Sequence, residues 1–239
     1  MKLRDFGKIF DLAAARKGGA ANLNRMLAET QSVAPRAVAA LSDDRVLSIM
    51  TKTIFAAGFA YRIVDRKWPG FEAAFRGFDP RACAFLHDER LDALMRDRSI
   101  IRSPRKIVSV PKNAQLVLDL AAEHGSAARY LASWPDRDFI DLVHILRKRG
   151  ANLGGETAMR FLRALGKPAF VASPDMIRAL VREGVLDRPS VGKKTLATVQ
   201  QALNQWAAET GRDLTFLSRV LSMSIDAAPS SRPRKGPIF

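Results

Sequence analysis

Cysteine is almost absent from this chain of 239 residues, in which Cys83 is the single example. One thiol excludes an internal disulfide and a zinc site built from several cysteines. His87, His124 and His144 lie far apart and do not show the spacing of metal ligands. We therefore expect neither a metal nor a cofactor.

Long apolar runs are also missing, since none approaches the roughly 18 residues that a membrane-spanning helix needs. The first residues, Met1 to Phe6, do not form an apolar secretory segment. We expect a cytoplasmic protein without a membrane span. There is no Gly-rich nucleotide loop, nucleophile triad or metal motif, which argues against a metabolic enzyme that acts without nucleic acid.

Negative charge is scarce, because 39 lysines and arginines oppose 24 aspartates and glutamates. The formal charge of +15 favours a polyanionic partner, although it does not distinguish DNA from RNA. Apolar residues make up 47% of the chain, which is enough to bury a core in one domain or in two closely packed lobes.

Strand patterns are missing as well, since no segment alternates apolar and polar residues at period two, whereas helical spacing recurs throughout. The sequence therefore predicts an all-α fold. We expect a helix from Phe59 to Lys67 to break at the Trp68-Pro69-Gly70 segment, and Pro111 to kink or divide a long helix that opens at Ser103. The helical domain spans residues 1–226, and the basic, proline-rich residues 227–239 are predicted to be a mobile tail.

A glycine hairpin is the central feature of what is present. Two amphipathic patterns, over residues 139–146 and 159–165, flank the segment Leu153-Gly154-Gly155. Glycines let backbone N–H groups approach an anion, and the second helix points the positive end of its dipole the same way. The hairpin is a candidate phosphate site, although glycine-linked helices also occur as plain connections.

A second basic segment precedes the hairpin. Arg102, Arg105 and Lys106 lie in a window where Asp97 is the only acidic residue, so we regard them as candidate ligands of DNA phosphate. The alternative is an ordinary solvated surface, where lysine and arginine are common.

Two motifs resemble known DNA repair enzymes. Leu153 to Ala158, followed by an apolar helix, Gly166 and Pro168, is similar to the helix-hairpin-helix of the DNA glycosylase superfamily. An ordered series of further segments resembles the type I 3-methyladenine DNA glycosylases, over more than half of the chain. These segments are AGFAY at 57–61, FEAAFRGFDP at 71–80, IIRSPRKI at 100–107 and KRG at 148–150.

The resemblance implies a two-lobed helix-hairpin-helix DNA glycosylase fold, in which the N- and C-terminal parts meet in one lobe. It implies hydrolysis of the N-glycosidic bond of 3-methyladenine in double-stranded DNA by a monomeric enzyme. The target nucleotide would be flipped into the cleft between the lobes, because the bond is inaccessible inside a duplex.

The resemblance also assigns roles to aromatic residues. Phe59 matches the position that wedges into DNA, where an apolar side chain fills the space left by the flipped nucleotide. Tyr61 matches an aromatic position of the base pocket, and a ring suits the cationic 3-methyladenine. Phe55 and Trp68 are expected as neighbours in that pocket. Packing in the core is the alternative for each of these rings.

Several positions depart from the family pattern. Thr53 occupies the position of the glutamate that recognises the base, and it can donate a hydrogen bond but cannot counter a positive charge. Family members often hold a zinc with two cysteines and two histidines, which a chain with one cysteine cannot do. Glu156 occupies the position of the nucleophilic lysine of bifunctional members, so no Schiff base forms there and we expect no lyase activity.

Aligned through Gly166 and Pro168, the general aspartate of the superfamily falls on Ser173. Asp175 is the nearest carboxylate and a candidate catalytic residue, with helix capping as the alternative role. A cationic base leaves as a neutral molecule, so a monofunctional glycosylase for 3-methyladenine is the favoured hypothesis. A glycosylase-like DNA-binding protein without activity, and a glycosylase of different alkylated-base range, are the alternatives.

Overall fold

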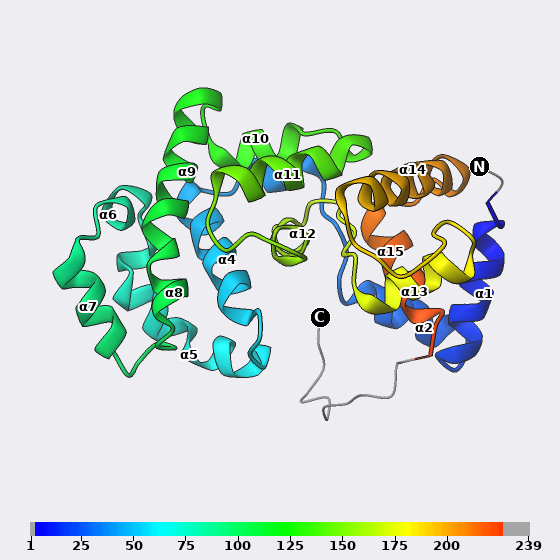
Figure 1. Cartoon of the computed structure of the whole chain (residues 1–239), viewed down its shortest axis with the longest axis horizontal. Helices are drawn as coiled ribbons and strands as arrows, with labels where there is room; N and C mark the ends of the chain where they lie inside the picture. The colour runs from blue at the N-terminus through cyan, green and yellow to red at the C-terminus, as the bar shows by residue number, and fades with distance from the viewer. Residues whose placement is uncertain (1–2, 227–239) are drawn as a thin grey trace.

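The computed structural model describes residues 3–226, and within that range it contains helices and no strand. This confirms the all-α prediction. The predicted tail at 227–239 lies outside the described residues. The helices gather in two lobes, seen at the left and right of Figure 1, with a central group between them.

The first lobe comprises α4 (Asp43–Ala56), α5 (Tyr61–Ala74), the 3-10 helix η1 (Arg76–Phe78), α6 (Pro80–Ala84), α7 (Asp88–Arg96), α8 (Pro104–Ile107) and α9 (Ser109–His124). The second comprises α1 (Phe6–Arg16), α2 (Ala20–Ala28), α13 (Pro174–Arg182), α14 (Lys193–Thr210) and α15 (Leu214–Met223). The central group comprises α3 (Pro35–Ala39), α10 (Ala127–Ser133), the 3-10 helix η2 (Asp136–Asp138), α11 (Phe139–Arg149) and α12 (Thr157–Ala164).

The two ends of the described chain meet in the second lobe, because α1 packs against α15 and α14. The rings of Phe6 and Trp206 lie edge to face with their centroids 5.6 Å apart, and the Phe6 backbone N–H donates to Glu209 at 3.0 Å. Arg219 of α15 donates to the carbonyl oxygens of Met26 and Leu27, which satisfies carbonyls at the end of α2. The implied meeting of the chain ends is confirmed.

Helix α5 corrects one prediction, because it runs through Trp68-Pro69-Gly70 to Ala74 without a break. A proline inside a helix removes one hydrogen bond and costs about 3 kcal/mol. Packing offsets that cost: the indole N–H of Trp68 donates to Glu72 one turn later at 3.0 Å, and Phe71 is buried. Gly70 fits because a Cβ there would lie 2.6 Å from the Ser99 carbonyl oxygen.

The long helix expected after Ser103 is divided, as predicted, into α8 and α9, which meet at Val108. Pro111 lies in the first turn of α9, where the missing N–H of a proline is tolerated.

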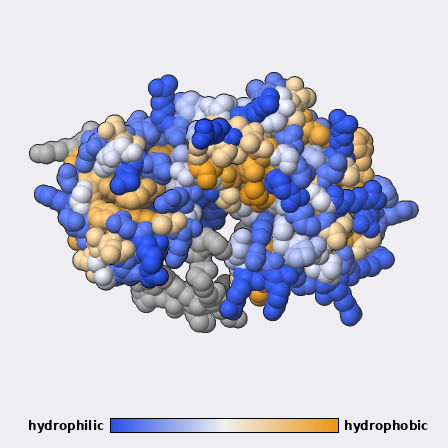
Figure 2. Space-filling model, turned by 180° about the vertical axis from the view of Figure 1, so that it is seen from behind, coloured by the Kyte–Doolittle hydropathy of each residue, from blue (hydrophilic) through white to orange (hydrophobic). Residues whose placement is uncertain are grey.

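No described helix is both long enough and apolar enough to cross a membrane. Seen from behind, the surface is hollowed between the lobes (Figure 2).

Candidate nucleic-acid interface

The glycine hairpin between α11 and α12 has the tight geometry that its sequence predicts. Leu153 is buried and anchors the turn, while Gly154 and Gly155 are exposed. Gly155 adopts φ +55°, a left-handed conformation that favours glycine, and Asn152 adopts φ +58°. The Leu153 side chain therefore fixes the hairpin in the core and leaves the two glycines at the surface.

Asn113 of α9 fixes the beginning of this hairpin. Its side-chain amide donates to the Ala151 carbonyl at 3.0 Å, and its oxygen accepts from the Ala151 N–H at 2.7 Å. Asn113 is 0% exposed, so both hydrogen bonds are shielded from water. This reciprocal pair holds the hairpin on the first lobe.

The short helix α8 lies between the hairpin and the loop that carries Phe59. Arg105 Nε donates to Asn152 at 3.2 Å, and the Asn152 amide donates back to the Arg105 carbonyl at 3.0 Å. The ammonium of Lys106 donates to the Phe55 carbonyl at 3.2 Å and to the Ala57 carbonyl. Neighbouring residues of one helix thus contact two separate candidate DNA-binding loops.

Phe59 projects from the α4–α5 loop with 44% of its surface exposed, which suits the predicted wedge. The Lys106 ammonium lies 4.7 Å from the centre of the Phe59 ring. Burial lowers the pKa of Lys106 below its ordinary value. The Lys106 ammonium therefore binds the loop of residues 57–60 (the wedge loop). Arg102 and Arg105, the other predicted phosphate ligands, are exposed.

Tyr61 and Trp68, which the sequence assigns to the base pocket, lie on the side of α5 that faces α4. Tyr61, Asp65, Trp68 and Glu72 repeat along one face of α5. Opposite them, Lys52 of α4 forms an ion pair with Asp65 at 2.6 Å, and its ammonium lies 5.3 Å from the Tyr61 ring centre and 5.4 Å from that of Trp68. Burial would lower the pKa of Lys52, but Asp65 and Tyr61 outweigh it and raise that pKa.

Glu72 is a second carboxylate on this face, and it is fully engaged. Both its oxygens accept from the Arg45 guanidinium at 2.9 Å, and one accepts from Ser48 at 2.7 Å and from the Trp68 indole. Burial on its own would raise the pKa of Glu72, but the hydrogen bonds from Arg45 and Ser48 outweigh it and lower that pKa. Glu72 therefore stays ionised and orients Trp68.

Two residues predicted for the pocket make contacts within the first lobe. Phe55 is 0% exposed and packs edge to face against Phe71 with ring centroids 4.6 Å apart, which agrees with packing in the core, the alternative role. The Thr53 hydroxyl donates to the Ile49 carbonyl one turn earlier at 2.9 Å. That bond satisfies the hydroxyl within its own helix.

The carboxylates near the second lobe are paired with arginines. Ser173 caps α13 by accepting from the Met176 N–H at 3.3 Å. Asp175 accepts from Arg178 at 2.7 Å in the first turn of the same helix. Glu156, at the start of α12, forms an ion pair with Arg160 at 2.6 Å.

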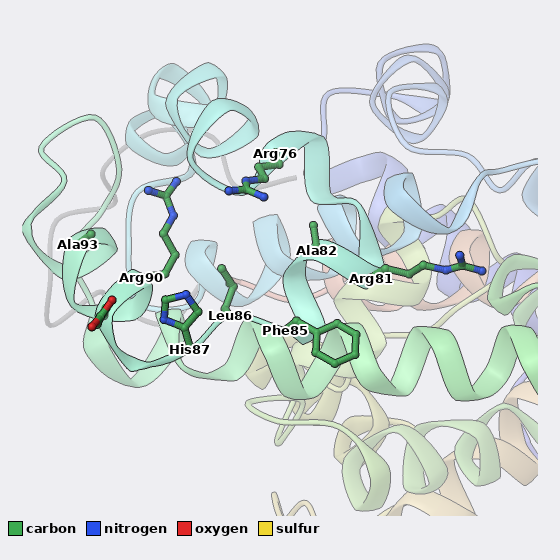
Figure 3. A pocket seen from close by; sticks show the side chains of 9 residues that line it. Arg76, Arg81, Ala82, Phe85, Leu86, His87, Arg90 and Ala93 are labelled. Carbon is green, nitrogen blue, oxygen red and sulfur yellow. The ribbon is translucent and has the colours of Figure 1, made fainter.

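A pocket of about 560 Å³ lies at the corner between α6 and α7, away from the wedge loop. Figure 3 shows Arg76, Leu86, His87 and Arg90 around it. It adjoins the turn whose Gly77 carbonyl accepts from Arg45 at the start of α4, while the wedge loop follows the other end of that helix. A 14-residue helix is about 20 Å long, so this pocket is separate from Tyr61.

The described residues do not fit the zinc site that is common in the family that the sequence resembles. Cys83 is buried, and no group of three or more His, Cys, Asp and Glu in the range 3–226 is placed to hold an ion. We assign no role to a metal.

The wedge loop, basic helix and glycine hairpin lie within one continuous stretch of sequence. The pattern of the methyladenine glycosylase family matches residues 37–167, more than half of the chain. The chain belongs to this family. The matched residues include Thr53, Phe59 and Tyr61, helix α8 and the complete hairpin, whereas Asp175 lies beyond them.

Solved structures agree at the level of the fold. An 8-oxoguanine DNA glycosylase of Thermotoga maritima is 14% identical with a TM-score of 0.56, covering 91% of this chain and 95% of its own. A 3-methyladenine DNA glycosylase I of Staphylococcus aureus is 23% identical with a TM-score of 0.47, covering 52% and 77%. The first likeness shows that this methyladenine glycosylase family member has the helix-hairpin-helix glycosylase fold over nearly its whole length.

Sequence reasoning missed several residues of this interface. Lys52, Asp65 and Glu72 join α4 to α5, and Asn113 and Asn152 hold the hairpin. A signal for the first group was present, because residues 61, 65, 68 and 72 share one face of a helix. No comparable periodicity marks the two asparagines.

Proposed function

We propose that this protein is a monofunctional DNA glycosylase that flips a damaged base out of the duplex and hydrolyses its N-glycosidic bond, with 3-methyladenine as the expected substrate. The observation that carries the proposal is the connection of the exposed Phe59 loop to the glycine hairpin through α8. A wedge and a phosphate-binding turn held together are the parts that base flipping needs.

Each part has a role in this scheme. The hairpin glycines receive one backbone phosphate beside the lesion, and the exposed Arg102 and Arg105 add positive charge along the strand. Phe59 enters the stack and takes the place of the flipped nucleotide. The flipped base then lies against the α4–α5 face at Tyr61 and Trp68, which are partly exposed.

Hydrolysis of the N-glycosidic bond needs little acid catalysis when the base is cationic, because the base leaves as a neutral molecule. Water adds to the deoxyribose C1′, the bond to the base breaks, and the electron pair of that bond neutralises the departing 3-methyladenine. One proton leaves the water, and Asp175 is the candidate to accept it. Glu156, paired with Arg160, provides no amine for a Schiff base at its position, which supports hydrolysis without strand cleavage.

A second candidate is a glycosylase of different base range, and Lys52 favours it. The Lys52 ammonium already lies over the Tyr61 ring, and the Thr53 hydroxyl is bonded to Ile49. This arrangement presents a cation from Lys52, the residue next to Thr53, which occupies the carboxylate position of the family pattern. A neutral base with a carbonyl oxygen would accept a hydrogen bond from Lys52, whereas a cationic base would be repelled.

The deciding experiment measures free base released from methylated duplex DNA, with 3-methyladenine and 7-methylguanine separated by chromatography. A duplex panel with neutral oxidised or deaminated bases is tested in parallel, with Phe59→Ala and Tyr61→Ala beside the parent. Selective 3-methyladenine release that falls in both variants supports the proposal. Release of neutral bases alone supports the second candidate, and binding without any release means a DNA-binding protein that lacks the activity.

A further inference from the structure

Helix α8 makes contacts on two sides that the assignment of its basic residues to phosphate does not explain. We infer that α8 is a strut that fixes the spacing between the wedge loop and the glycine hairpin, with Lys106 and Arg105 as its positioning residues. The inference rests on the proposed function, because it concerns how DNA binding is coupled to flipping.

The wedge side depends on Lys106. Residues 57–59 are exposed and Gly58 adopts φ +81°, so this loop has little packing of its own. Lys106 donates to carbonyls at the C-terminal end of α4, where a cation opposes the negative end of the helix dipole. The same ammonium lies over the Phe59 ring, so one side chain fixes both the loop backbone and the direction of the wedge.

The hairpin side depends on the neighbouring residue. Arg105 and Asn152 exchange two hydrogen bonds, one through the Arg105 backbone carbonyl and one through its guanidinium. Asn152 adopts a left-handed conformation immediately before Leu153 and the two glycines. The bond through the backbone means that α8 itself, rather than a free side chain, holds the turn.

The helix is rigidly placed between these two contacts. Ile107 is buried in the core, and the Ser109 hydroxyl of α9 donates to the Lys106 carbonyl at 2.7 Å. A phosphate captured at the hairpin is therefore held at a fixed distance from the point where Phe59 enters the stack. Loosening the strut should weaken wedge insertion much more than it weakens binding.

The test uses the full-length protein and a duplex with a tetrahydrofuran abasic analogue beside 2-aminopurine, whose fluorescence rises when a wedge unstacks it. Titration gives Kd, and saturation gives the amplitude of the rise. Lys106→Met removes the charge at similar length, Lys106→Arg keeps it, and Asn152→Gly deletes the bridge while allowing φ +58°. Arg102→Ala removes an exposed charge of the same segment and is the matched control.

We expect Lys106→Met and Asn152→Gly to lower the saturated amplitude at least threefold, with Kd raised no more than in Arg102→Ala, and Lys106→Arg to restore it. Lys106→Met should add little to Phe59→Ala, because it acts through that ring. Full fluorescence amplitude in Lys106→Met would overturn the inference about α8. A fall in amplitude explained by a higher Kd alone, as in Arg102→Ala, would also overturn it. If Lys106→Met does not fold, Asn152→Gly decides by the same criteria.

The two proposals fail separately. If the parent protein gives the full fluorescence rise but releases no base, the proposed glycosylase activity is wrong and the inference about α8 is unaffected. If the parent and Lys106→Met release base at the same single-turnover rate and give equal fluorescence amplitudes, the inference about α8 is wrong. The proposed glycosylase activity is then unaffected. A parent without any fluorescence rise overturns the strut directly.

Discussion

The ammonium of Lys52 lies over the ring of Tyr61, 5.3 Å from its centre, and is held there by Asp65. The aromatic residue expected to stack on a cationic base already has a cation of the protein beside it. The pair with Asp65 is neutral overall, but the ammonium lies nearer to the Tyr61 ring than a diffuse surface charge would. If the proposed base pocket is correct, Lys52 should influence the charge of the base that this face accepts.

Lys52→Gln should change the preference between cationic and neutral bases. A cation over a ring gains about 0.5 to 2 kcal/mol, so removing the competing ammonium should raise 3-methyladenine release, relative to release of a neutral base, by about 2- to 30-fold. Single-turnover rates on the two duplexes give the ratio. Arg66→Gln, which removes an exposed cation from α5, serves as the control, and an unchanged ratio in Lys52→Gln would exclude this role.

Glu72→Gln should destabilise the first lobe by about 1 kcal/mol, a value that allows for solvent screening of a partly exposed group. The pKa of Glu72 is lowered in the folded state, so its stabilisation is present above the ordinary value of 4.5 and is lost as the pH falls through the folded pKa. Urea unfolding of parent and variant should differ at pH 7 and converge below pH 4.5. A difference that persists at low pH would assign the effect to packing.

Gly154 and Gly155 provide a matched pair, because a Cβ at either would meet nothing within 4 Å. Gly155→Ala should cost about 1 kcal/mol of stability because of its φ of +55°, whereas Gly154→Ala should cost less. If a phosphate approaches the backbone closely, both substitutions should raise Kd for duplex DNA. Equal affinity in Gly154→Ala and the parent would show that no close approach occurs at that residue.

Cys83 should resist alkylation in the native protein. Burial, followed by the charge of Asp79, raises the pKa of its thiol to about 12, and the thiol donates to the Phe75 carbonyl. Iodoacetamide at pH 8 should leave the folded protein unmodified and label it completely in denaturant, as read by mass spectrometry. Rapid labelling of the native protein would show that the packing of α6 opens.

Local patterns were enough to predict much of the fold. The long helix after Ser103 is divided and the glycines follow Leu153 in a tight turn, because helix breaks and turns depend on the few residues that form them. The ordered segments from 57 to 150 also predicted the family, which the match to residues 37–167 confirms.

Other parts of the site depended on information that no local pattern contains. Phe55 and Phe59 are both apolar, yet one is buried in the core and the other is exposed, because the end of α4 separates them. Pro69 predicts a break that packing against Ser99 and within the aromatic core overrides.

The sequence by itself determined an all-α, basic protein with a glycine hairpin, since composition and helical periodicity are properties of the chain alone. The tertiary structure decided that Lys52 covers Tyr61 and that α8 joins the wedge loop to the hairpin. The residues of these pairs are 9 to 51 positions apart in the chain. The crossing of packed helices sets which of their side chains meet, and that crossing arises only when the core forms.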